Sequence, residues 1–126
     1  MPVRAIRGAV QAESNSRTAI GGASRQMIIE ILKRNNVSID EIIAVFFTVT
    51  SDLNADFPAR AVREQGSEWS NVAFQCTMEM EVPGSMRRVI RVLMLCETAK
   101  AQADISHVFL GETARLRPDL AGESAQ

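Results

Sequence analysis

The sequence predicts an α+β fold in which a mixed β-sheet carries helices on one of its two faces. Strand-like runs outnumber helical ones, and the one long helix has a single apolar stripe, so it can cover only one face of a sheet. The opposite face would still be apolar, and a chain of 126 residues has nothing left to cover it. We therefore expect self-association through that face.

The first half of the chain predicts a strand, a helix, a turn and a second strand. Asn15 or Ser16 can cap the helix, whose apolar residues recur at spacings of three and four. Ser38 and Glu41 have the spacing of a capping box. The run AVFFTVT is branched and aromatic, which is typical of a buried strand. The predicted elements are a strand at 3–11, a helix from about 16 to 35, a short helical turn at 40–43 and a strand at 44–50.

The second half predicts one short helix and several strands. Asp56 precedes Phe57 and Pro58, a pattern that caps a helix and places proline in its first turn, and Gly66 would end this helix. The segment 86–97 is ambiguous by periodicity, but its branched residues and the preceding Pro-Gly turn favour a long strand. The other predicted elements are a strand at 72–76, an extended piece at 78–82, a strand at 107–113 and a polar tail, flexible from about 115.

Length and composition fit a single domain over residues 1–126, because domains commonly contain roughly 100 to 150 residues. No stretch approaches the roughly 18 consecutive apolar residues of a membrane span, and the first residues lack the pattern of a secretory signal. We expect a cytoplasmic protein that binds no membrane and whose Cys76 and Cys96 are free thiols. The net charge of −1 also argues against a nucleic-acid partner.

Several kinds of catalysis are not expected. His107 is the one histidine, there is no tyrosine, and no cluster has the spacing of a zinc site, so hydrolytic triads, metals and cofactors do not fit. The pair Gly21 and Gly22 lies in a helical pattern without the context of a phosphate loop. The residue type that is left as a source of binding or catalytic groups is arginine. Of the 14 basic residues, only Lys33 and Lys100 are lysine. This bias suits carboxylate binding, although genomic base content explains it equally well.

Arg91 is the first candidate for a binding or catalytic group. Alternate residues of a strand share one face, so Arg91 would lie among valine and leucine side chains. A guanidinium there loses hydration and requires an anion, which is either a ligand or an internal partner such as Glu79 or Glu97. Arg87 and Arg88, next to the turn, are expected at the solvated surface.

Five other residues are weaker candidates. Arg7 lies between small apolar residues of the first strand, but a strand-end arginine that points to water is the alternative. Arg60 and Arg63 are three apart on the short helix and could meet one dianion together, although a solvated helix face is commoner. Cys76 lies three residues before Glu79, and this pair could hold a hydroxyl group. The alternative is that the carboxylate is a partner of an arginine.

Six motifs in order resemble the AroH family of chorismate mutases. They are IRGA (6–9), FPARAVRE (57–64), Cys76 with EMEV (79–82), RVIRVLM (88–94), HVFL (107–110) and LRPDL (116–120), and the likeness extends from Arg4 to Leu120. It implies a homotrimer whose three sheets form a barrel-like core, with clefts at the subunit boundaries. It also implies the rearrangement of chorismate to prephenate, in phenylalanine and tyrosine biosynthesis, without a cofactor.

The resemblance also assigns roles by position. Arg91 would lie beside the breaking ether oxygen, and Arg7 would bind a substrate carboxylate from the same side. Glu79 and Cys76 would hold the ring hydroxyl. The neighbouring chain would line the cleft, and two residues of the tail would close it. The lining residues implied are Phe57, Ala59, Arg60, Arg63, Phe74 and Gln75, and the closing residues are Leu116 and Arg117.

The chain departs from the family pattern at three places. Phe109 stands where a tyrosine is usual, so one hydroxyl contact to the ligand is missing. Arg60 stands where a lysine is common, which retains the charge. Phe74 and Gln75 replace a pair of small residues, so the cleft would have a different shape.

Two other functions fit the sequence. One is a trimeric sensor that binds a small carboxylate without converting it. The other is an imine-hydrolysing enzyme like those of the trimeric Rid family, which also position an arginine for a carboxylate. That family does not explain the motifs FPARAVRE and LRPDL.

Overall fold

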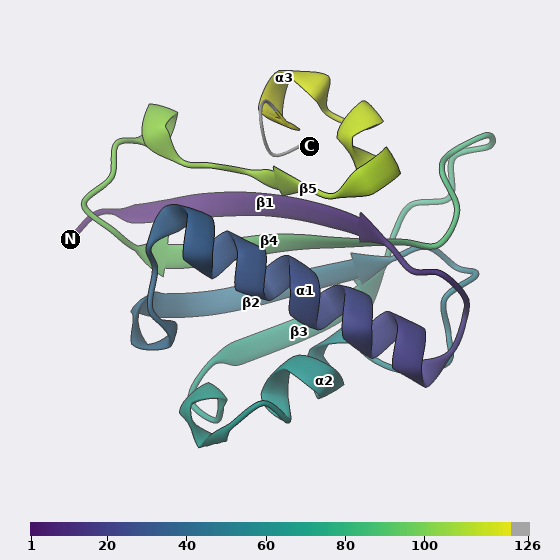
Figure 1. Ribbon diagram of the computed structural model, residues 1–126, viewed down its shortest axis with the longest axis horizontal. Coiled ribbons are helices and arrows are strands. Elements are labelled where there is room, and N and C mark those ends of the chain that lie inside the picture. The colour runs from purple at the N-terminus through teal and green to yellow at the C-terminus, as the bar shows by residue number, and fades with distance from the viewer. Residues whose placement is uncertain (122–126) are drawn as a thin grey trace.

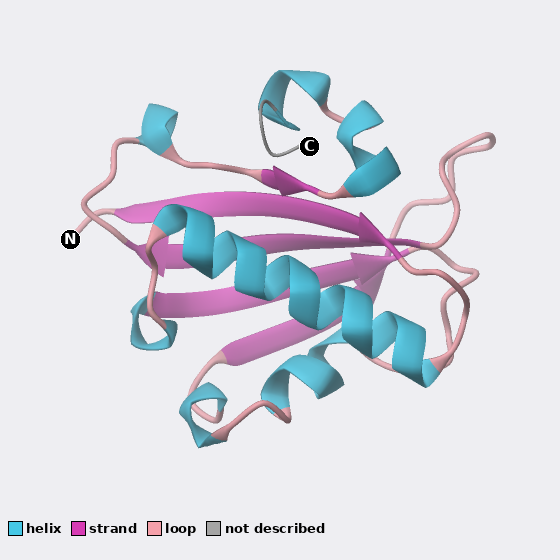
Figure 2. Ribbon diagram, in the orientation of Figure 1, coloured by secondary structure: helices cyan, strands magenta, loops and turns pink. Residues whose placement is uncertain are grey.

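A computed structural model of the protein describes residues 1–121. Five strands form one mixed sheet in the order β3-β2-β4-β1-β5, and the helices α1 and α2 lie against one of its faces (Figures 1 and 2). The α+β architecture predicted from the sequence is therefore confirmed. The strands are β1 (Val3–Gln11), β2 (Ile42–Val49), β3 (Ala73–Met78), β4 (Val89–Glu97) and β5 (Val108–Phe109), and the helices are α1 (Arg17–Asn35), α2 (Pro58–Arg63) and α3 (Pro118–Ala121).

The sheet mixes both kinds of pairing. β4 lies antiparallel to β1 and to β2, whereas β3 runs parallel to β2 and β5 runs parallel to β1. The register places Thr48 of β2 opposite Arg91 of β4. Because directly opposite residues of two strands point to the same face, these two side chains are neighbours.

The helix α1 covers the sheet along its length. The Ser16 hydroxyl accepts a hydrogen bond from the amide of Ala19 at 3.1 Å, and Asn36 ends the helix with a φ of 53°. Its apolar stripe is fully buried against the sheet, and Gly8 of β1 permits this close approach. A β-carbon at Gly8 would lie 3.0 Å from a side-chain atom of Ile31. The buried apolar residues of α1 are Ile20, Met27, Ile28 and Ile31.

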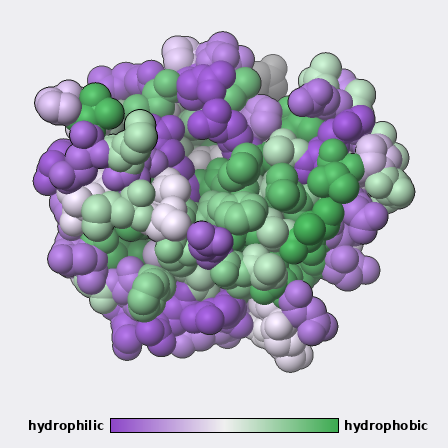
Figure 3. Space-filling model, turned by 180° about the vertical axis from the view of Figure 1, so that it is seen from behind, coloured by the Kyte–Doolittle hydropathy of each residue, from purple (hydrophilic) through white to green (hydrophobic). Residues whose placement is uncertain are grey.

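The other face of the sheet is apolar and, apart from the end where the C-terminal segment packs on Ala9 and Val89, uncovered, as predicted. In β4 the buried side chains Ile90, Val92 and Met94 alternate with Arg91 and with leucines that are partly exposed. Figure 3 shows this face, where hydrophobic side chains gather over the middle of the sheet. The large apolar residues exposed on its strands include Val3 (51%), Leu93 (40%) and Phe46 (38%). Such a patch is typical of a surface that binds another protein.

Several predicted boundaries between β1 and β4 are wrong; β3, for example, ends at Met78 and not at residue 76. The helical turn is a 3₁₀ turn at Ile39–Glu41, so β2 begins at Ile42, two residues earlier than expected. β4 begins at Val89 and not at residue 86, because Arg88 has a φ of 57° and gives its amide hydrogen to Asp52. Nor is Arg88 a solvated surface residue, since its guanidinium also donates to the carbonyl of Ala12.

The C-terminal part also differs from the prediction. The strand expected at 107–113 contains only Val108 and Phe109, because Gly111, with a φ of 59°, turns the chain into a 3₁₀ helix at Gly111–Arg115. The tail forms α3 next to β5, and its flexibility stays a prediction. Residues 122–126 lie outside the described part. Within the described part, no helix is long and apolar enough to cross a bilayer.

Candidate active site

The centre of the candidate site is an ion pair on the uncovered face of the sheet. The Nε atom of Arg91 lies 2.7 Å from Oε2 of Glu79, and the Thr48 hydroxyl donates to Oε1 of Glu79, also at 2.7 Å. Glu79 follows the end of β3, where its amide donates to the carbonyl of Val49 at 2.8 Å. The internal partner that the sequence allowed for Arg91 is therefore present. Only Nε of Arg91 takes part in these bonds.

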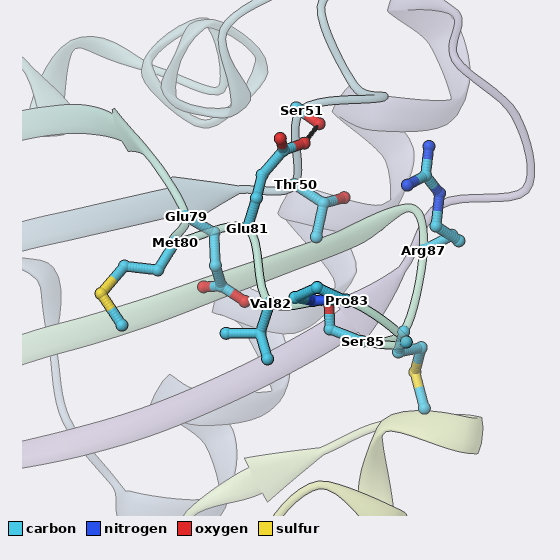
Figure 4. A pocket seen from close by; sticks show the side chains of 11 residues that line it. Thr50, Ser51, Glu79, Met80, Glu81, Val82, Pro83, Ser85 and Arg87 are labelled. Atoms are coloured by element: carbon cyan, nitrogen blue, oxygen red, sulfur yellow. Dashed lines mark hydrogen bonds between the residues drawn. The ribbon is translucent and has the colours of Figure 1, made fainter.

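Figure 4 views the segment that begins at Glu79 and connects β3 to β4. The Glu79 carboxylate turns toward β4, whereas Glu81 points the other way and accepts a hydrogen bond from Ser51. The two carboxylates of this segment therefore have different partners. Glu79 alone of the two acidic side chains reaches Arg91.

The ion pair lines a hollow of about 420 Å³. Arg7 contributes a second guanidinium to it, and among the described residues Arg7 has no carboxylate within ion-pair distance. The hollow thus contains two cationic side chains and one carboxylate. Its net charge is positive, which suits an anionic ligand. The hollow is lined by Arg7, Phe46, Thr48, Glu79, Arg91, Val92 and Leu93.

His107 fixes the backbone of Arg7, a contact that sequence reasoning missed. Its Nδ1 atom accepts a hydrogen bond from the Arg7 amide at 2.9 Å, which requires an imidazole that is unprotonated at Nδ1. Burial lowers the pKa of His107, and the charges of Arg7 and Arg117 lower it further. His107 is therefore neutral near pH 7. The sequence contained only a lone histidine, and nothing in its spacing indicated this pairing.

The stability of the fold should respond to pH through His107. Its pKa in the folded protein lies below the unfolded value of about 6.5, so the unfolded chain binds a proton first as the pH falls. The contribution is complete above about pH 6.5 and is lost as the pH decreases below it. We expect the thermal midpoint to decrease more between pH 7 and pH 5 for the wild type than for His107→Asn. Parallel decreases would contradict this.

Four predicted cleft residues lie together in a second hollow or next to it, on the side of the sheet that carries the helices. Asp56 and Arg17, which the sequence did not predict as site residues, help to line this hollow of about 420 Å³. Asp56 binds Arg60 at 2.7 Å and Arg17 at 3.1 Å, and the hydrogen bond from Arg60 is the main reason why the pKa of Asp56 is lowered. The predicted residues are Phe57, Arg60 and Cys76 in the lining, and Ala59, which is buried in α2 behind it.

Cys76 and Glu79 do not come together within the chain. Residues three apart on an extended strand point to opposite faces, so the Cys76 thiol lies beside α2, where burial raises its pKa. Phe74 also packs on that side, and it lines a further groove with Arg63. Gln75 lies between Phe74 and Cys76 in β3 and is exposed. Within one chain the thiol and the carboxylate therefore lie on opposite faces of the sheet and do not form the predicted pair.

Phe109 does not reach either hollow. It is 1% exposed and packs with Ala9 and Val89 in a small apolar cluster that Leu116 joins from the tail. In this chain the ring therefore supports the fold, and a role of Phe109 in substrate binding stays a prediction. Arg117 binds Asp119 through two parallel bonds of 3.1 and 2.9 Å.

Comparison with known proteins identifies the family. The sequence model of chorismate mutase type I matches residues 3–120. The chain belongs to this family. Chorismate mutase AroH of Thermus thermophilus is 46% identical over 125 residues, which are 98% of this chain and 99% of that protein. Chorismate mutase AroH of Bacillus subtilis is 37% identical over 121 residues, which are 96% and 94% of the two chains.

A solved structure agrees with this assignment. The chorismate mutase from Clostridium thermocellum has a TM-score of 0.85 and 40% sequence identity, and the match covers 88% of this chain and 97% of that one. The fold described above is thus that of a chorismate mutase.

Proposed function

We propose that this protein is an isomerase that rearranges chorismate to prephenate, a Claisen-type reaction within one molecule, in the biosynthesis of phenylalanine and tyrosine. Family membership and the 46% identical AroH relative support this activity. The observation that carries the proposal is the pair of arginines, Arg7 and Arg91, in one hollow with a single carboxylate, Glu79. Chorismate is a dianion, and the hollow has the complementary charge.

The reaction breaks a carbon–oxygen bond and forms a carbon–carbon bond, so it needs no nucleophile and no proton transfer. The substrate must adopt a compact chair-like shape, and fixed cations that bind its two carboxylates can hold it there. As the bond to the ether oxygen breaks, that oxygen becomes partly negative. A guanidinium nitrogen of Arg91 beside it binds more strongly in the transition state than in the ground state, which accelerates the reaction.

We further propose that the active protein is a homotrimer with a site at each subunit boundary. Arg7, Glu79 and Arg91 would form one wall of the site, and the residues of the second hollow in a neighbouring protomer would form the other. Two observations support this: the two groups lie on different sides of one sheet, and the uncovered sheet face is apolar. Arg60 and Arg63 would then add positive charge, while Cys76 would approach Glu79 from the other chain.

Three smaller points complete the proposal. Residues 1–126 would act as one domain, in which Leu116 and Arg117 lie at the base of the tail that closes the site. The protein would work in the cytoplasm, which agrees with the free thiols of Cys76 and Cys96. The proposed reaction takes place without a cofactor.

A spectrophotometric assay of chorismate tests the activity directly. We expect loss of chorismate with stoichiometric formation of prephenate, and a rate that varies little near neutral pH because no group has to gain or lose a proton. Tight binding without conversion would favour the carboxylate sensor. If the protein neither binds nor converts chorismate, imine hydrolysis becomes the better hypothesis. A sharp bell-shaped pH profile centred near pH 7 would contradict the mechanism.

A further inference from the structure

We propose that Thr48 is a positioning residue that keeps one oxygen of Glu79 away from Arg91, so that the terminal nitrogens of Arg91 stay available to the substrate. This inference rests on the proposed function, since it assigns Arg91 to the ether oxygen. Thr48 is not a catalytic residue here, because its action passes through Glu79.

The geometry places Thr48 beside both partners. It lies directly opposite Arg91 in the antiparallel pair of β2 and β4, and it also lines the hollow. Its hydroxyl donates to Oε1 of Glu79 at 2.7 Å, while Oε2 of the same carboxylate accepts from Nε of Arg91 at 2.7 Å. Each oxygen of Glu79 therefore has its own donor, and the donors come from adjacent strands.

Without Thr48, Arg91 and Glu79 could form a pair with two hydrogen bonds. An arginine and a carboxylate commonly form two parallel hydrogen bonds, in which one terminal nitrogen of the guanidinium joins Nε in binding the carboxylate. Arg117 and Asp119 form such a pair in this protein. Between Arg91 and Glu79 only one bond is made: Nε donates to Oε2, while Oε1 is turned toward the Thr48 hydroxyl and not toward a terminal nitrogen. Without the hydroxyl, Oε1 would turn to a terminal nitrogen of Arg91 and occupy it.

The backbone strengthens this effect. The Glu79 amide donates to the carbonyl of Val49, the residue next to Thr48, so the main chain and the side chain of Glu79 are both held by the end of β2. A β-branched side chain in a strand has few rotamers, which keeps the hydroxyl of Thr48 in place. Serine would retain the donor with more freedom, and valine would retain the shape without the donor.

Thr48→Val tests the proposal, with Thr77→Val as the matched control. Thr77 is paired with Thr48 across β2 and β3, but its hydroxyl faces the carbonyl of Phe47 and not Glu79. We expect Thr48→Val to lower kcat about tenfold, the effect of losing one hydrogen bond to a charged group, and to change KM by less than about twofold. Thr77→Val should leave both constants near those of the wild type. Thr48→Ser should recover most of the lost kcat.

A double-mutant cycle separates positioning from direct binding. In a protein that already carries Glu79→Gln, we expect Thr48→Val to reduce kcat by less than about twofold, because its effect passes through the carboxylate. An undiminished tenfold loss in that background would overturn the proposal. So would a loss confined to KM, or a Thr48→Ser variant no better than Thr48→Val.

A crystal structure of the Thr48→Val variant gives a readout that does not depend on the reaction. We expect Oε1 of Glu79 within hydrogen-bond distance of a terminal nitrogen of Arg91. A carboxylate that keeps its wild-type orientation would overturn the positioning role even if the wild type converts chorismate. If the wild type fails to convert chorismate, the proposed function fails, while the structure of the variant still decides whether Thr48 orients Glu79.

Discussion

Replacing Arg91 by alanine should lower kcat/KM for chorismate by about 100-fold or more, or about 3 kcal/mol of transition-state stabilisation, the scale of one lost preorganised donor. Most of the loss should appear in kcat, because the contact to the ether oxygen becomes stronger as that oxygen gains charge. Steady-state kinetics measured by loss of chorismate give both constants.

Arg34→Ala is a suitable control for this experiment. Arg34 also forms an ion pair, with Glu30 at 2.8 Å, but it lies on α1 and away from the hollow. We expect its kinetics to match those of the wild type. Near-normal turnover by Arg91→Ala would remove Arg91 from the mechanism, whatever the control shows.

Replacing Leu95 by glutamate should dissociate the assembly and reduce the activity with it. Leu95 lies on the uncovered face of β4, two residues beyond Leu93, and it does not line the hollow. A carboxylate buried without a partner in an apolar interface costs several kcal/mol, enough to separate protomers that associate through this face. We expect the solution mass to decrease from that of a trimer to that of a monomer, and kcat/KM to decrease more than about tenfold.

Ile29→Glu is the matched control for Leu95→Glu. Ile29 is an apolar residue of α1 that is 51% exposed on the side away from the sheet. The same new charge there should change neither mass nor activity. A Leu95→Glu protein that remains trimeric would show that the protomers associate through another surface, and a fully active monomer would contradict a site shared between subunits.

The sequence was sufficient for the main elements because their signals are local. The Ser16 cap and the apolar stripe of α1 depend on neighbours within a few residues, and both are present. The length of the last strand was predicted wrongly, because Gly111 has a φ of 59° and turns the chain into a 3₁₀ helix. The apolar uncovered face could be predicted because the one long helix has a single apolar stripe and can cover only one face of the sheet. This argument does not depend on how the strands pair.

The site was harder to predict, because it depends on pairing between distant strands. The register that brings Thr48 beside Arg91 joins residues 43 positions apart (91 − 48), and no local pattern encodes it. The separation of Cys76 from Glu79 could have been predicted, however. Alternation along an extended strand places residues three apart on opposite faces, a rule that needs only the sequence.

The position of Arg91 beside the ether oxygen can be seen in a crystal structure of the assembly with a bicyclic dianionic ether that mimics the transition state. We expect a terminal nitrogen of Arg91 at hydrogen-bond distance from the ether oxygen, with Glu79 still bound to Nε and α2 of a neighbouring protomer on the other side of the ligand. An Arg91 side chain directed away from the ligand, toward bulk solvent, would contradict it.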